Sequence, residues 1–405
     1  MIQLLIFYLL CYTLYKFNGF FFNNLFYSDK MSLFFNLLNF LIFFFFFFLI
    51  LNSWDFTILL ILSFVIFFVF SSISILQMYI YFELSLIPIF MIIVNKGKQF
   101  ERKKASLFMF FFTIFSSLPL LVLIIFMKNQ FFYSLLSVEN FYLNFSYLMI
   151  FLYLGFMVKL PVFFFHMWLP KAHVEAPVQG SMVLAGIMLK LGGYGLFKIM
   201  ILTYKNWFFM KMWMKSMLLM GLMFSTAYCL ILSDLKITIA VSSVSHMTLS
   251  VLSLSTLSKE GLLGFFLMMI SHGYLSPLLF FFANCLYERS NTRSLFLSKS
   301  WFSYSFPMFS ILILSVNFCF PPSLNFFSEA VILLSLISWS KFTFLLLFGY
   351  MMITTIYSLF IFTILSSRSN KIYSCLDLTV NELSLNLMIL CLIFFSFLLI
   401  AKLNF

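Results

Sequence analysis

Ionisable side chains stand inside stretches of this sequence that are apolar enough to cross a lipid bilayer. Lys159 lies in FLYLGFMVKLPVFFFHMWLP, and Lys190 lies in GSMVLAGIMLKLGGYGLFKIM. An ammonium group near the bilayer centre costs about 2.5–3.5 kcal/mol on insertion scales. Leucine or methionine would fill the same space without that cost, so the two lysines indicate a functional site. The chemistry open to such residues is the transfer of protons or other ions across the membrane.

A carboxylate at similar depth could control the charge of the first lysine. Glu83 lies in LQMYIYFELSLIPIFMII, far from the nearest basic loop. Two unit charges 6 Å apart at an effective dielectric constant of 20 interact by about 3 kcal/mol. A nearby Glu83 would hold Lys159 charged, and separating the two would let Lys159 pass its proton to Lys190. The alternative is a static buried ion pair that fixes helix packing.

Further titratable residues follow in the second half of the chain. His246 and His272 lie in apolar stretches, and Glu329 follows a pair of prolines at mid-span. Histidine titrates close to physiological pH and can pass protons, although a single buried histidine is more often structural. Lys236 could be a relay member or a loop charge, and His166 is an intermediate case.

The composition places the chain in a membrane. It has 405 residues, of which 64% are hydrophobic and 9% are charged, whereas soluble domains carry about 25% charged residues. The sequence therefore predicts an all-α polytopic membrane protein. We attribute the 64 phenylalanines to a T-rich codon bias, because phenylalanine can replace leucine in lipid at little cost.

Several classes of function are excluded by the same inventory. The net charge of +12 resides in short basic loops, which is a topology signal rather than a nucleic-acid surface. The six cysteines form no CxxC pair, and no nucleotide-binding motif is present, so we expect no zinc, iron–sulfur or nucleotide site. The first apolar segment lacks the features of a cleaved signal and reads as a retained helix.

Apolar segments of spanning length predict about thirteen transmembrane helices. Three of the four basic loops follow an even-numbered helix, which puts those loops and the N-terminus on the inner face; the loop at 205–215 disagrees. The segments fall near 2–15, 32–52, 55–75, 76–94, 105–127, 142–165, 177–203, 212–233, 236–257, 260–286, 301–339 (broken), 343–366 and 384–402.

Prolines inside the apolar spans suggest broken helices and a repeat. Pro161 and the pair Pro321–Pro322 lie about 160 residues apart, and Pro119 and Pro277 keep a similar offset. Proline removes a helical hydrogen bond and clashes with the preceding turn. Interrupted helices at corresponding positions of two halves are typical of internally repeated transporters. The alternative is chance alignment of nine prolines.

The central motif resembles a known signature. VKLPVFFFHMWLPKAHVEAPVQGSMVLAGIMLKLGGYG (158–195) closely resembles that of the chain 4 family among the antiporter-like subunits of mitochondrial NADH–ubiquinone oxidoreductase (respiratory complex I). The similarity extends over about residues 75–340, through YFELSLIPIF, DLKITIAVSSVSHM, SHGYLSPLLFFFAN and PPSLNFFSEA. A terminal glutamate at 329, where related antiporter-like chains carry lysine, favours this family over its neighbours.

The resemblance implies two inverted five-helix repeats with broken helices and a midplane chain of charged residues. It divides the chain into N-terminal helices (1–54), a first repeat (55–204), a second repeat (205–366) and a C-terminal helix (367–405). We expect about one of the family's helices to be missing before residue 30. By motif position, the proton path implied is Glu83, Lys159 on the first broken helix, Lys190, His246, His272 and Glu329 on the second.

The function implied is that of a proton-translocating subunit in the membrane arm of a H⁺-translocating NADH:ubiquinone reductase. NADH, flavin, iron–sulfur clusters and ubiquinone would bind other subunits, and this chain would hold no cofactor. Its partners would be neighbouring antiporter-like chains and lipid, in the mitochondrial inner membrane, with no nucleic acid. The alternatives are a stand-alone or multisubunit cation/proton antiporter, and a membrane scaffold that transports nothing.

Overall fold

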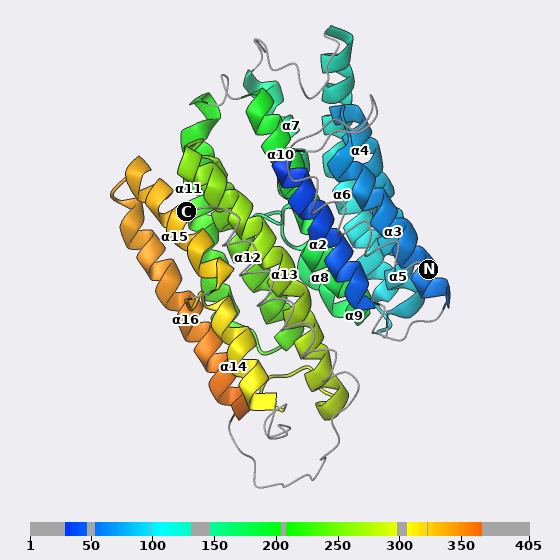
Figure 1. Cartoon of the computed structure of the whole chain (residues 1–405), viewed down its shortest axis with the longest axis vertical. Coiled ribbons are helices and arrows are strands. Elements are labelled where there is room, and N and C mark those ends of the chain that lie inside the picture. The colour runs from blue at the N-terminus through cyan, green and yellow to red at the C-terminus, as the bar shows by residue number, and fades with distance from the viewer. Residues whose placement is uncertain are drawn as a thin grey trace. The chain divides into compact units, whose positions relative to one another are not determined.

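The computed structural model describes residues 29–46, 53–97, 99–130, 146–203, 208–297, 306–321 and 323–366 (Figure 1). All regular elements in these ranges are helices. The chain divides into two compact units, residues 1–161 with 165–213, and residues 162–164 with 214–405. The helices predicted at 2–15 and 384–402 lie outside the described residues.

The first unit is organised around α7 and α3. Within it α7 packs against α6 and α10, and α3 packs against α2 and α4. The elements α9, η1 and α10 follow one another without a break and form a single apolar span, Val178–Leu202. The bounds are α2 Lys30–Phe46, α3 Ser53–Ser71, α4 Ile75–Leu84, α5 Leu86–Lys96, α6 Arg102–Gln130, α7 Ser146–Lys159, α8 Trp168–Glu175, α9 Val178–Val183, the π-helix η1 Leu184–Met188 and α10 Leu189–Leu202.

The second unit is built around α13. This helix packs against α12 and α15 along its length and also contacts α14, while α16 packs against α14 and α15. Figure 1 shows α12 and α13 side by side. The bounds are α11 Phe208–Ile231, whose first turns belong to the first unit, α12 Leu235–Leu254, α13 Lys259–Ser290, α14 Phe306–Asn317, α15 Leu324–Trp339 and α16 Thr343–Ser366.

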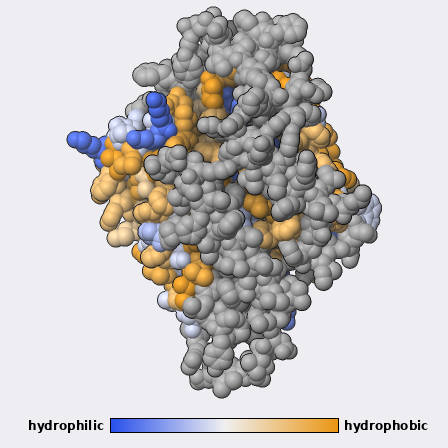
Figure 2. Space-filling model, viewed as in Figure 1, coloured by the Kyte–Doolittle hydropathy of each residue, from blue (hydrophilic) through white to orange (hydrophobic). Residues whose placement is uncertain are grey.

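The described helices have the length and composition of membrane spans. Eight of them in the described ranges are long and apolar enough to cross a bilayer, and three shorter apolar helices accompany them. Side chains on the visible described surface are mostly hydrophobic, as Figure 2 shows. The predicted all-α polytopic class is therefore confirmed, whereas the inverted relation of the two repeats and the full count of thirteen helices stay predictions.

The first predicted break lies directly after Lys159. Helix α7 ends at this residue, and Pro161 offers no N–H to continue the helical hydrogen bonds. The indole Nε1 of Trp168 donates to the carbonyl oxygen of Val158 at 2.9 Å, so a side chain satisfies a carbonyl at the helix end. Phe164 adopts φ 80°, a left-handed conformation that turns the chain before α8 begins.

The second break is a C-terminal cap in which a cysteine takes the place usual for glycine. Cys319 has φ 60°, and its N–H donates to Val316 O at 3.3 Å, while Phe320 N–H donates to Ser315 O at 3.0 Å. These two bonds define a Schellman motif, which ends a helix and satisfies its last carbonyls. Helix α14 therefore ends at mid-span through its own cap.

A proline acts after the cap of α14 and not within that helix. Pro321 follows the cap, where it prevents the helix from resuming, and Ser323 then caps the start of α15 with its hydroxyl. Pro322 lies outside the described residues. Pro119 and Pro277, whose spacing resembled that of the breaks, lie inside the continuous helices α6 and α13.

Most of the motif PKAHVEAP (170–177) lies in a short helix, α8. Lys171, His173 and Glu175 belong to α8, and His173 is fully buried. The ammonium of Lys171 lies 4.3 Å from the ring centroid of Phe108. This short helix packs against α6.

Candidate functional site

A buried ion pair stands at the first helix break. The Nζ atom of Lys159 lies 2.6 Å from Oε1 of Glu83, a contact that both the switch and the static ion pair require. The lysine side chain is 5% exposed and the glutamate 22% exposed. Nζ also lies 3.2 Å from the ring centroid of Phe82, a cation–π contact that stabilises the charged ammonium in a poorly hydrated place.

Glu83 also lies beside an irregularity in its helix. The span 75–96 is interrupted at Ser85, between α4 and α5, where the sequence predicted one continuous helix. Pro88 explains the interruption, because its ring clashes with the carbonyl three to four residues earlier. The hydroxyl of Ser85 donates to Phe82 O at 2.6 Å. Both partners of the ion pair are thus held at helix irregularities.

Lys190 is fully buried on α10. Its Nζ donates to the carbonyl oxygen of Ala185 at 2.6 Å, and Ala185 belongs to the π-helical turn η1. Single π-helical turns within α-helices are frequent at functional sites. A Cβ on Gly192 would lie 3.0 Å from the backbone N of Leu160, so α10 passes very close to the chain just beyond Lys159.

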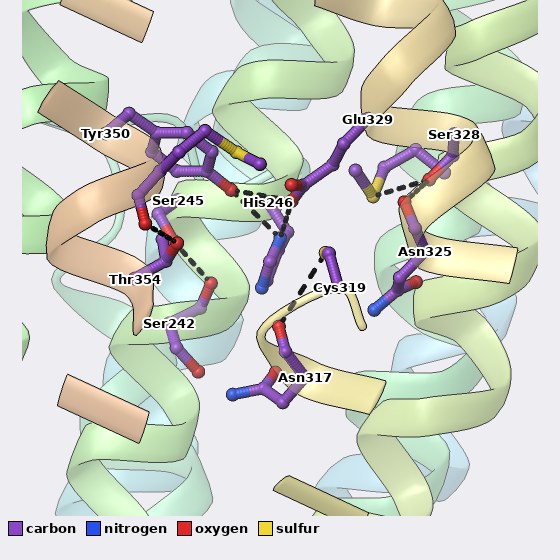
Figure 3. A network of polar contacts seen from close by, with 12 residues as sticks. Ser242, Ser245, His246, Asn317, Cys319, Asn325, Ser328, Glu329, Tyr350 and Thr354 are labelled. Atoms are coloured by element: carbon purple, nitrogen blue, oxygen red, sulfur yellow. Dashed lines mark hydrogen bonds and ion pairs between the residues drawn. The ribbon is translucent and has the colours of Figure 1, made fainter. Parts of the chain in front are cut away.

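The second break carries its own polar cluster (Figure 3). The hydroxyl of Tyr350 donates to Glu329 Oε1 at 3.0 Å and lies 3.2 Å from His246 Nδ1. Because the hydroxyl has one hydrogen, which Glu329 receives, its oxygen accepts from the Nδ1–H of His246. The direct distance from Nδ1 to Oε1 is 3.4 Å. All three side chains are almost completely buried.

The remaining candidates fall into two groups. His272 joins the second cluster, since its ring centroid lies 5.7 Å from that of His246. Lys236 is buried in the first turn of α12, and His166 is half-buried in the segment between α7 and α8. The structure thus brings Glu83 to Lys159 and groups three candidates in the second unit.

Sequence reasoning missed several buried polar residues. Tyr350 is fully buried, and its signal was a tyrosine in an apolar span, where a hydroxyl needs a partner. Lys215 stood at the overlap of the basic loop 205–215 and the predicted span 212–233. It lies in α11, is fully buried and has its ammonium 4.0 Å from the ring centroid of Trp339. Lys198 pairs with Asp29. The signal in the sequence for this contact was Lys198 itself, a basic residue inside an apolar span that needs a partner.

Metal chemistry has no support among the described residues. No group of three or more His, Cys, Asp or Glu side chains there could hold a metal ion. The described cysteines Cys229, Cys285 and Cys319 are all free and buried. The polar groups assembled at the two breaks are hydrogen-bond donors and acceptors.

These features define a polytopic α-helical membrane protein whose helix breaks hold buried ionisable groups. The family described as "NADH:quinone oxidoreductase/Mrp antiporter, TM" matches residues 72–356. NADH-ubiquinone oxidoreductase chain 4 of Myxine glutinosa is 40% identical over 331 residues, covering 79% of this chain and 71% of that protein. Chain 4 of Artemia franciscana is 44% identical over 278 residues, covering 67% and 70%. The chain therefore belongs to the NADH:quinone oxidoreductase/Mrp antiporter membrane-subunit family.

Solved structures agree on the fold. A chain of respiratory complex I from Thermus thermophilus matches with a TM-score of 0.86 at 20% identity, covering 95% of this chain and 87% of that one. A chain of an archaeal membrane-bound sulfane sulfur reductase matches with a TM-score of 0.81 at 15% identity, covering 97% and 87%. The family resemblance inferred from the central motif is confirmed.

Proposed function

We propose that the chain is a proton-translocating membrane-arm subunit of respiratory complex I, in the mitochondrial inner membrane. Relatives that match most of the chain carry the name NADH-ubiquinone oxidoreductase chain 4. In this proposal NADH, flavin, iron–sulfur clusters and ubiquinone bind other subunits, and neighbouring antiporter-like chains and lipid surround this one. The residues that carry the protons are Glu83, Lys159, Lys190, His246, His272 and Glu329.

The observation that carries the proposal is the contact between Lys159 and Glu83 at a helix break. The pair is bonded at 2.6 Å in a largely buried place, where a charge without a partner is costly. Because α7 ends at Lys159, a small movement of the break changes the distance between the two charges. Lengthening that distance makes the ammonium unfavourable and favours release of its proton.

The second cluster supplies a ready relay. When His246 is an imidazolium and Glu329 a carboxylate, the Nδ1 proton of His246 can pass to the oxygen of Tyr350 while the hydroxyl proton of Tyr350 passes to Glu329. The step leaves a neutral imidazole with its proton on Nε2, a neutral tyrosine and a protonated Glu329. The two distances, 3.2 Å and 3.0 Å, are within the range of hydrogen bonds. Tyr350 thus bridges two groups whose direct contact is longer.

Substitution of the paired residues in the assembled complex tests this proposal. Lys159→Met and Glu83→Gln are each expected to lower the number of protons moved per NADH oxidised at least twofold. The matched control is Lys104→Met, since Lys104 forms an exposed pair with Glu101 at 3.9 Å and such pairs contribute little. Proton movement is followed with a pH-sensitive dye in vesicles while NADH oxidation is measured spectrophotometrically. Normal assembly with normal pumping in both variants would show that the pair is a scaffold contact.

A cation/proton antiporter is the second candidate, because the matched family includes Mrp antiporters. An antiporter exchanges sodium or potassium for protons without NADH. Vesicles with an imposed cation gradient and no NADH distinguish the two. Acidification that depends on the gradient and vanishes in Lys159→Met supports the antiporter, whereas acidification that requires NADH supports the complex I subunit.

A further inference from the structure

Basic side chains from two helices gather where α6 begins. Lys103, in the first turn of α6, and Lys171, on α8, are both exposed. The ammonium of Lys171 lies 4.3 Å from the ring centroid of Phe108, and Lys103 precedes Leu107 by four residues, so those two share one face of α6. The two lysines therefore stand beside neighbouring residues of the same helix, and Arg102 adds a third positive charge next to Lys103. The basic patch consists of Arg102, Lys103 and Lys171.

Little negative charge offsets the basic patch. Residues 99–108 and α8 contain two acidic side chains. Glu175 is buried at the end of α8, and the carboxylate of Glu101 lies 3.9 Å from the ammonium of Lys104. The first turn of a helix also carries the positive end of its dipole, which disfavours cations. The patch therefore does not serve to stabilise α6, and its charge is complementary to that of an anion.

Apolar side chains continue from the basic patch along the exposed face of α6. Phe108 and Phe112 stack with their ring centroids 5.8 Å apart, and Leu107 and Phe111 are exposed beside them. These four residues form an apolar stripe over the two turns that follow the patch. An exposed apolar face on a membrane span suits the acyl chains of lipid, which are as apolar as leucine. Cations followed by such a stripe match the two parts of a phospholipid, its phosphate and its acyl chains.

The basic patch lies at a boundary of the membrane. Helix α5 ends at Lys96 and α6 begins at Arg102, so a short loop joins two candidate spans there. Helix α8 ends at the same level, because a Cβ on Gly97 would lie 2.9 Å from the carbonyl oxygen of Glu175. Lipid phosphates occupy this level, between water and the hydrocarbon core.

Helix α16 offers a matched comparison within the chain. Near its start Phe344 and Phe348 are exposed and stack with their ring centroids 6.4 Å apart, as Phe108 and Phe112 do on α6. A single basic residue, Lys341, lies within five residues of that start. The face of α16 suits the acyl chains of any lipid, whereas the basic patch gives α6 a preference for an anionic headgroup.

We propose that the basic patch and the apolar stripe of α6 bind an anionic phospholipid, with its phosphate at Lys103 and Lys171 and its acyl chains along the stripe. Ammonium groups bind phosphate as point charges, and basic residues close to the end of a span attract anionic lipids. The positive-inside rule explains basic loops in general, whereas Lys171 belongs to a helix that packs against α6. The lipid contact goes beyond proton translocation and does not depend on it.

Photolabelling of the assembled complex tests the preference for charge. Complexes are reconstituted in phosphatidylcholine vesicles that contain a trace of either phosphatidylglycerol or phosphatidylcholine, each with a diazirine in one acyl chain. Labelled peptides are then quantified by mass spectrometry. We expect the anionic probe to label α6 at least fivefold more than the zwitterionic probe, because each basic residue near the surface strengthens binding about fivefold. The two probes should label α16 equally, and added salt should reduce the difference at α6 because salt screens exposed charges.

Variants without the two ammonium groups identify the residues. Lys103→Gln combined with Lys171→Gln should lower labelling of α6 by the anionic probe at least fivefold, to the level of the zwitterionic probe. Lys103→Arg combined with Lys171→Arg keeps both charges and should label like the unsubstituted protein, which separates loss of charge from loss of structure. Lys341→Gln, next to the matched face of α16, should leave labelling of α6 unchanged.

Several results would contradict the proposal. Equal labelling of α6 by both probes would show that this face contacts lipid without selecting charge. Unchanged labelling in the double glutamine variant would remove Lys103 and Lys171 from the contact. No labelling of α6 by either probe would mean that another subunit covers this face, and loss of labelling on addition of inorganic phosphate at constant ionic strength would mean that the patch binds free phosphate. These measurements need no NADH, so their outcome is distinct from that of the pumping test.

Discussion

The buried ion pairs of the first unit have different roles according to where they stand. Asp29 directly precedes α2 and contacts Lys198 on α10, and the ammonium of Lys198 lies 5.3 Å from the ring centroid of Tyr194. Neither residue of this pair adjoins a helix break. The contact therefore joins two helices and is not expected to move protons.

Breaking this pair should destabilise the chain without changing pumping. Lys198→Met leaves Asp29 half-buried without its partner, which we expect to cost about 2 kcal/mol, because removing one member of a buried pair strands the other charge. The measurement is the temperature at which the subunit is lost from heated complexes. Protons moved per NADH in the surviving complexes should match the unsubstituted protein. The exchange of both residues, Asp29→Lys with Lys198→Asp, should recover part of the loss, and a pumping defect in Lys198→Met would contradict the structural assignment.

At the residue scale, the charged side chains of the candidate site could be recognised from the sequence more readily than the neutral side chains that contact them. Glu83 and Lys159 stood out because an ionised side chain is rare in an apolar span. Tyr350 did not, because tyrosine is common in such spans and its bridging role depends on three helices meeting. Lys215 was counted both in the basic loop at 205–215 and in the apolar segment at 212–233, because basic residues near a span end usually mark a loop. It lies in α11, with its ammonium 4.0 Å from the ring centroid of Trp339.

At the scale of elements, the close approach of α10 to the end of α7 should be sensitive to a single methyl group. Gly192→Ala would place Cβ 3.0 Å from Leu160 N and 3.2 Å from the carbonyl carbon of Lys159, and both are backbone atoms that cannot turn aside. We expect this variant to displace the break and lower protons moved per NADH at least twofold.

A second glycine provides the control for this prediction. A Cβ on Gly349 would meet only Met223 Cε, at 3.2 Å, and a flexible methionine can move away. Gly349→Ala should therefore assemble and pump normally in the same assay. Equal pumping in the Gly192→Ala and Gly349→Ala variants would show that the spacing of α7 and α10 has no part in proton transfer.

The prolines in the sequence predicted some helix ends correctly and others wrongly. Pro161 and Pro321 marked both breaks correctly, because proline cannot continue a helix. Pro119 and Pro277 lie within continuous helices, since neighbouring helices in a membrane protein can accommodate proline. The cap at Cys319 could not be foreseen, because a left-handed conformation is usual for glycine and asparagine rather than cysteine.

At the scale of the whole molecule, helices differ sharply in burial although all are apolar. In the most apolar stretches of α12 and α13, 94% of the residues are buried, whereas in those of α6 and α16 the share is 33%. Composition predicted that these helices lie in a membrane, but it could not predict which of them are most buried. A side chain that faces lipid is as apolar as one that faces protein. Burial of α12 and α13 instead follows from their polar residues, which include His246 and His272 and need protein partners.

Substitutions on the exposed face of α6 test whether this face contacts lipid and why the chain has so many phenylalanines. Phe115 is 82% exposed near the middle of the span. Phe115→Leu should leave assembly and pumping unchanged, because either side chain suits lipid and the phenylalanine then reflects codon bias alone. Phe115→Lys places an ammonium at the bilayer centre, at a cost of about 2.5–3.5 kcal/mol, and should reduce the amount of assembled complex several-fold. Both variants are measured by native gel electrophoresis of solubilised membranes. A strong defect in Phe115→Leu would mean that this face of α6 is shaped for a specific protein neighbour, and the excess of phenylalanine would then have a structural cause.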